Sequence, residues 1–119
     1  MLKVDELLVY QKLCVLHLEI HKLTFTFPKF ELYELGSQMR RSSGSPAANL
    51  AEGFDNKHTK IYLESISRAH GEIRETQHHL KVAHGNGYVD QQNLDRLLNS
   101  YDECGKMLRG LEKSLTNRL

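Results

Sequence analysis

The apolar residues of this 119-residue chain recur every three or four positions along four long stretches. This spacing puts them on one side of an α-helix and is typical of helices that pack together. We expect helices over residues 5–23, 31–54, 59–83 and 90–115, with Asp5 and Asp90 as N-caps. No stretch shows the alternation of apolar and polar residues that is typical of a β-strand. The pattern therefore predicts a single all-α domain over residues 1–119, an antiparallel up-down-up-down four-helix bundle.

The first stretch has a wider apolar face than a single neighbouring helix needs. Its central row comprises Val9, Leu13, Leu16, Ile20, Leu23 and Phe27, and further apolar residues at Leu7, Leu8, Cys14 and Leu18 flank this row. A face this wide indicates burial against more than one neighbour.

The second stretch combines apolar helical spacing with residues that disfavour a helix. Gly44 and Pro46 lie in its middle, and an interior proline costs a helix about 3 kcal/mol or more. One interpretation is a break into two helices between residues 42 and 45. The other is one long helix kinked near Ser45-Pro46, with serine hydroxyls bonding the freed carbonyls. The apolar spacing stays in phase across the proline, which favours the kinked helix.

Two adjacent arginines in the second stretch must differ in environment. Neighbouring helical residues point about 100° apart, so Arg40 and Arg41 cannot face solvent in the same way. We place Arg41 at the inner edge, where it needs partners because an unpaired buried charge is costly. The predicted structural network comprises Arg41, Asn49, Glu52 and Glu75. The functional alternative is a phosphate-binding surface formed by Arg40, Arg68 and Arg74.

Charge and composition narrow the functional classes. Sixteen basic and fifteen acidic residues give a net charge of +1, so a nucleic-acid surface requires an uneven placement of charges. Cys14 and Cys104 belong to no C-x-x-C pair, and we expect two reduced thiols. Neither a signal peptide nor an apolar run of about 20 residues is present, so we expect a cytoplasmic protein without a membrane partner.

Catalytic and metal motifs find no support in the sequence. A di-iron bundle needs two Glu-x-x-His motifs, and only Glu75 and His78 have this spacing. Ser42, Ser43 and Ser45 lie near Gly44 but do not form G-x-S-x-G, and no phosphate-binding glycine loop occurs. We therefore expect a protein that is not an enzyme, with no catalytic residue, metal or cofactor.

Several motifs resemble those of the four-helix-bundle family encoded in intervening sequences of bacterial 23S rRNA genes. The most specific are Gln38-Met39-Arg40-Arg41, Ser45-Pro46 and Asn49-Leu50-Ala51-Glu52-Gly53-Phe54. Weaker similarity extends to residues 22–28, 68–75 and 105–111. Three positions depart from the family pattern: no apolar residue separates Ser45 from Pro46, Glu72 stands where serine is common, and Asp55-Asn56 replaces Gly-Arg.

The resemblance implies an assembly and a role. Family members look like homopentamers, and a relative, the accessory protein of diversity-generating retroelements, uses a basic surface associated with reverse transcriptase and nucleic acid. By resemblance we expect a homo-oligomeric, non-enzymatic module. We expect it to bind either structured RNA associated with rRNA or an RNA–protein complex. The alternative is a protein-binding adaptor without a nucleic-acid role, which the near-neutral charge favours.

Overall fold

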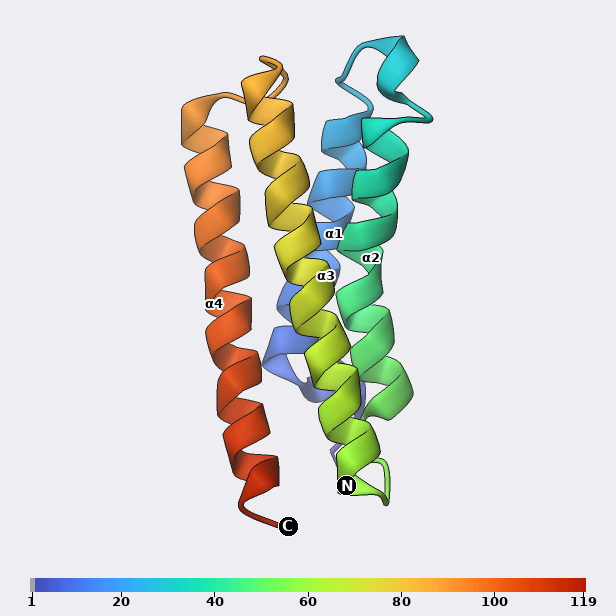
Figure 1. Ribbon diagram of the computed structural model, residues 1–119, viewed down its shortest axis with the longest axis vertical. Helices are drawn as coiled ribbons and strands as arrows, with labels where there is room; N and C mark the ends of the chain where they lie inside the picture. The colour runs from blue at the N-terminus through green and yellow to red at the C-terminus, as the bar shows by residue number, and fades with distance from the viewer. Residues whose placement is uncertain (1) are drawn as a thin grey trace.

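The computed structural model describes residues 2–119, in which four long helices lie side by side (Figure 1). They are α1 (Leu8–Thr24), α2 (Leu35–Gly53), α3 (Thr59–Gly85) and α4 (Gln91–Thr116). Two single-turn 3-10 helices, η1 (Val4–Glu6) and η2 (Lys29–Glu31), precede α1 and α2. Successive long helices run in opposite directions in Figure 1, so the predicted all-α up-and-down bundle is confirmed.

The first two long helices begin later than predicted. Asp5 lies in η1 and does not cap α1, which starts after extended Leu7; the Asp5 backbone carbonyl accepts a hydrogen bond of 2.7 Å from the Gln11 side chain. Glu31 lies in η2 rather than in α2. Its carboxylate accepts hydrogen bonds from the Leu35 backbone N–H at 3.4 Å and the Tyr88 hydroxyl at 2.8 Å. Glu31 therefore acts on the start of α2 from outside the helix.

The fourth helix begins as predicted. The Asp90 backbone is extended, and its Oδ1 accepts a hydrogen bond of 2.8 Å from the Asn93 backbone N–H. This bond satisfies one of the N–H groups that the first turn of any helix leaves without an internal partner. The prediction of Asp90 as an N-cap is confirmed.

The second helix continues through its proline. Pro46 is buried inside α2, so the two-helix alternative is wrong and the single helix is confirmed. Serine hydroxyls donate to carbonyls of the preceding turn: Ser43 to Arg40 at 3.3 Å and Ser45 to Arg41 at 3.0 Å. The carbonyl that Pro46, which has no N–H, leaves without a helical donor is that of Ser42, so these two bonds do not satisfy it, contrary to the expectation that serine hydroxyls bond the freed carbonyl.

The core lies between the four helices and is mostly aliphatic. Its fully buried large side chains include Leu13, Ile20, Met39, Leu50, Ile66, Leu80, Leu97, Tyr101 and Leu108. One polar pair joins α2 to α3 inside it, where the Thr76 hydroxyl donates to Ser42 Oγ at 2.9 Å. The same two helices approach closely at Gly53, where a Cβ atom would lie 2.3 Å from Ser65 Oγ. Glycine is required there for steric reasons.

The outer face of α1 is not covered by any other part of residues 2–119. Leu8, Val15, Leu18 and Phe25 are 60–64% exposed, whereas Leu7 and Cys14 are half-buried. The predicted wide apolar face therefore exists, but one subunit buries only its inner part. Both cysteines are free thiols, as expected, and burial raises the pKa of Cys104 to about 11. No helix among residues 2–119 is sufficiently long and apolar to cross a bilayer.

Candidate nucleic-acid interface

Arg40 bonds inside the fold rather than facing solvent. Its guanidinium donates to Thr24 Oγ1 at 2.9 Å and to the Leu32 carbonyl at 2.5 Å. The same group lies 5.2 Å from the centre of the Phe25 ring, in cation–π contact. Arg40 is therefore not on the predicted phosphate-binding surface, because its donors join the end of α1 to the segment before α2.

Arg41 has the outward position and pairs with α3. Its guanidinium forms ion pairs with Glu75 and, at 3.4 Å, with Glu72, and its side chain is 55% exposed. The predicted pairing with Glu75 is confirmed, and the inner-edge position is wrong. Among residues 2–119, Asn49 and Glu52 add no side-chain bond to this network. Glu52 is three helical turns from Arg41, about 16 Å along the axis, and is out of reach.

The Arg41 partner on α3 is shared with a histidine. Glu75 Oε2 also lies 3.2 Å from His79 Nε2, one turn further along α3. Desolvation raises the pKa of Glu75, but the hydrogen bonds from Arg41 and His79 outweigh it and lower that pKa below its usual value. Glu75 therefore stays ionised as the centre of a small network, and the exposed His78 lies outside it.

A serine–histidine contact is present but is inaccessible. His17 Nδ1 lies 2.9 Å from Ser43 Oγ, and the His17 ring packs against Gly44, where a Cβ would lie 3.0 Å away. Burial and the nearby His21 lower the pKa of His17. Because Ser43 is fully buried, its hydroxyl cannot reach a substrate. The contact packs α1 against α2, and the absence of enzymatic activity stays a prediction.

Arg68 and Arg74 are both exposed on α3 but do not share an edge. They are six positions apart along the helix, which puts them about 120° apart around the axis. Arg74 lines a groove between α3 and α4, together with Arg109 and His70. The structure therefore does not bring Arg40, Arg68 and Arg74 together on one patch.

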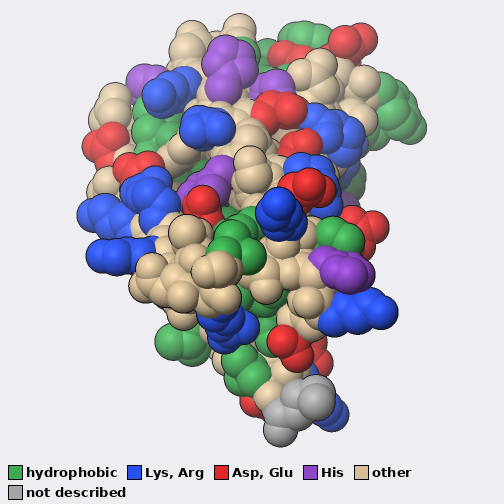
Figure 2. All heavy atoms as spheres, turned by 60° about the horizontal axis from the view of Figure 1, so that its bottom comes forward, with side chains coloured by type: hydrophobic (Ala, Val, Ile, Leu, Met, Phe, Trp, Pro, Cys, Tyr) green, Lys and Arg blue, Asp and Glu red, His purple; other side chains and the backbone are tan. Residues whose placement is uncertain are grey.

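Arg109 is the site residue that sequence reasoning missed. It lies within residues 105–111, which the sequence marks only by a weaker family similarity. Its position in the sequence was the available signal, because in antiparallel neighbours a residue two turns before the end of α4 lies opposite the middle of α3. Figure 2 shows basic side chains gathered at its left edge, the side of α4 in Figure 1, with acidic side chains between them.

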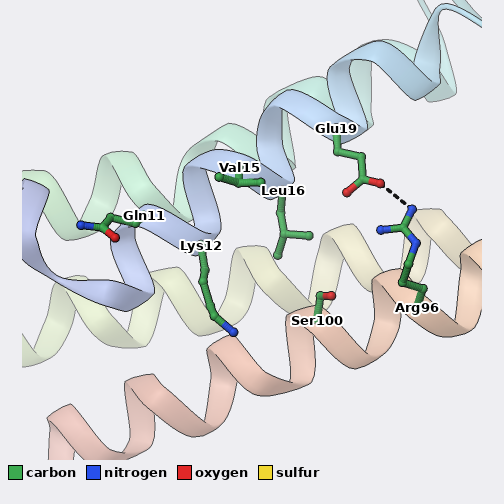
Figure 3. A pocket seen from close by; sticks show the side chains of 7 residues that line it. All are labelled: Gln11, Lys12, Val15, Leu16, Glu19, Arg96 and Ser100. Atoms are coloured by element: carbon green, nitrogen blue, oxygen red, sulfur yellow. Dashed lines mark hydrogen bonds and ion pairs between the residues drawn. The ribbon is translucent and has the colours of Figure 1, made fainter.

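Another hollow, with a volume of about 440 Å³, lies on a different face, between α1 and α4 (Figure 3). Its cations are neutralised: Lys12 pairs with Glu103 at 2.9 Å, and Arg96 pairs with Glu19. Val15, from the uncovered face of α1, also lines it. This hollow therefore continues the exposed apolar face and offers an anion no free positive charge.

Residues 5–110, most of the chain, match the family model described as 23S rRNA-intervening sequence protein. Among curated proteins none matches the chain. The matched range includes the motifs around Arg40 and Arg41 and the complete set of helices up to the last turns of α4. The chain therefore belongs to the 23S rRNA-intervening sequence protein family.

Proposed function

We propose that this protein is a non-enzymatic, homo-oligomeric module that binds structured RNA in an rRNA-associated setting. The family description, 23S rRNA-intervening sequence protein, supports an rRNA context. The observation that carries the proposal is the uneven pairing of charges on α3 and α4. Within residues 2–119, exposed cations without an ion pair on these helices are Lys60, Arg68, Arg74, Lys81, Lys106, Arg109 and Lys113.

Part of the acidic residues of the same two helices is bonded to basic side chains, whereas Glu64, Asp95 and Asp102 form no ion pair within residues 2–119. Glu72 and Glu75 are bound by Arg41, Glu103 by Lys12 and Glu112 by His70. A chain with a net charge of only +1 thereby presents free arginine and lysine on one pair of helices. Phosphate contacts of this kind supply affinity without reading the base sequence, so the proposed ligand is recognised by its backbone and shape.

Self-assembly is the second part of the proposal. Leu8, Val15, Leu18 and Phe25 are spaced seven, three and seven residues apart, which forms one apolar row along the outside of α1. A ring of identical copies, with a pentamer as the expected size, would bury this row. The ring would also repeat the weakly basic face of each subunit. Several weak contacts with one RNA molecule then add to a useful avidity.

RNA binding is tested by its dependence on salt. Fluorescence anisotropy of a labelled rRNA stem-loop should show binding at about 50 mM salt and a loss of about tenfold by about 200 mM for two phosphate contacts, because bound counterions are released. Replacing Arg68→Gln and Arg74→Gln should weaken binding several-fold, and replacing Lys22→Gln and Lys29→Gln, with the same charge change elsewhere, should not. Absence of binding at low salt would contradict the proposal.

The second candidate function is a protein-binding adaptor. The observation that favours it is the same apolar row on α1, which a partner helix would cover as well as a second copy would. The native mass separates the two functions. A protein that remains a single chain at high concentration and binds no RNA at low salt fits the adaptor and not the RNA-binding oligomer.

A further inference from the structure

We propose that the groove between α3 and α4 is a phosphate-binding site, with Arg74 and Arg109 as the ligands of one phosphate group. This groove, called here the α3–α4 groove, is lined by His70, Arg74 and Gln77 of α3 and by Asp102, Gly105 and Arg109 of α4. It has a volume of about 250 Å³, and an adjoining hollow of about 270 Å³ shares His70, Arg74 and Arg109. The assignment of RNA as the phosphate's source rests on the proposed function.

Hydrogen bonds between the two helices close both ends of the groove. At one end His70 Nε2 lies 2.7 Å from Glu112 Oε1. At the other end Gln77 Nε2 donates to Asp102 Oδ1 at 2.8 Å and to the Leu98 carbonyl at 3.3 Å. These bonds fix the relative register of the antiparallel helices. Arg74 and Arg109 lie between the two ends, at about the same level, and line both hollows from opposite walls.

The Arg109 side chain is exposed, and it folds back along α4 toward Gly105. A Cβ atom at Gly105, one turn earlier on α4, would lie 3.7 Å from Arg109 Nη1. Gly105 is buried and has no side chain, so the guanidinium lies directly over the helix backbone. This position keeps the Arg109 donors near the level of Arg74, where one tetrahedral anion contacts both groups.

Carboxylates are available in the groove, yet neither arginine pairs with one. Within residues 2–119, Glu112 is bonded to His70 and Asp102 to Gln77, and no ion pair involves Arg74 or Arg109. Arg74 and Arg109 line the groove from different helices, and an anion between them would form charge-assisted interactions with both guanidinium groups, against the repulsion of the Asp102 carboxylate in the same lining. Phosphate suits the site because its oxygens accept the paired N–H donors of each guanidinium.

The test uses the full chain and two sources of phosphate. Inorganic phosphate and adenosine monophosphate are titrated separately, and ¹H–¹⁵N spectra report the amides of residues 70–77 and 102–112. The labelled rRNA stem-loop is titrated in parallel by anisotropy. We expect saturable shifts confined to these amides, and a loss of about tenfold in RNA affinity when Arg74→Gln and Arg109→Gln are combined.

The matched control combines Arg68→Gln with Lys113→Gln, which removes two charges from the same helices outside the groove. It should retain the phosphate-induced shifts and lose at most about threefold in RNA affinity. Arg109→Lys keeps the charge but loses the paired donors, so it should fall between wild type and the double variant. Circular dichroism and thermal midpoints check that every variant is folded.

The outcomes separate this inference from the proposed function. If the wild type binds RNA but the groove and control variants lose affinity equally, the inference is wrong and the function stands. If phosphate saturates the groove and RNA does not bind, the function is wrong and the site stands. If only the groove variant loses RNA affinity, and neither inorganic phosphate nor adenosine monophosphate shifts the amide signals, the site binds the phosphates of the RNA backbone alone. If the groove variant binds RNA as tightly as the wild type does, and neither small phosphate shifts the amide signals, the inference is overturned.

Discussion

At the scale of single residues, the environments of Arg40 and Arg41 illustrate how a helix divides adjacent side chains. Arg40 turns toward the end of α1 and bonds a hydroxyl and a carbonyl, and Arg41 turns toward the α3 carboxylates. The exposed Arg41 pairs contribute little, because water screens ion pairs at the surface. The Arg40 bonds are half-buried, and removing the guanidinium leaves the Leu32 carbonyl without this donor.

Replacing Arg40→Ala should therefore destabilise the protein more than replacing Arg41→Ala. A hydrogen-bonded charged group of this kind contributes about 2 kcal/mol, against about 0.5 kcal/mol for an exposed ion pair. Chemical denaturation followed by circular dichroism measures both differences. Arg40→Lys, which retains the charge and part of the bonding, should be intermediate. Equal stabilities for the two alanine variants would contradict the inward role of Arg40.

At the scale of helices, side chains that lie outside a helix determine where it begins as much as the side chains within it do. Asp90 caps α4 from the preceding residue, whereas Asp5, with a similar position in sequence, ends up in η1. Glu31 bonds the first N–H of α2 from four residues away. In the middle of α2 the serine hydroxyls and the burial of Pro46 accompany a continuous helix despite its unfavourable composition.

The difference between the two aspartates predicts a difference in stability. Asp90→Ala removes the bond to the Asn93 N–H and should cost about 1 kcal/mol. Asp5→Ala removes no side-chain cap and should change the free energy of unfolding by less than about 0.5 kcal/mol. Urea denaturation of the two variants measures this contrast. A loss at Asp5 as large as that at Asp90 would mean that Asp5 supports α1 after all.

At the scale of the whole molecule, two exposed surfaces have different chemistry. The outer face of α1 is apolar, and the α3 and α4 side has unpaired cations. A monomer that exposes an apolar row along a full helix gains free energy when another surface covers it. We infer that the two surfaces have separate roles, self-association on α1 and phosphate contact on α3 and α4.

Charges placed on the α1 face should separate the subunits without unfolding them. Val15→Glu combined with Leu18→Glu alters side chains that are 64% and 61% exposed, so the fold should survive. Native mass spectrometry should show the single chain of 13.7 kDa in place of the oligomer. Gln92→Glu combined with Asn99→Glu adds the same charge on α4 and should leave the assembly intact. A wild type that is already a single chain would refute the self-association proposal.

The sequence by itself determined the helices, their number and most of their bounds, because helical spacing of apolar residues is a local property that survives without knowledge of neighbours. It also identified the pairing of Arg41 with Glu75 and the cap at Asp90. Only the tertiary structure decided which arginine turns inward, that Glu72 rather than Glu52 joins Arg41, and that Arg109 lies opposite Arg74. Those contacts depend on the rotation and register of packed helices, which many distant side chains set together.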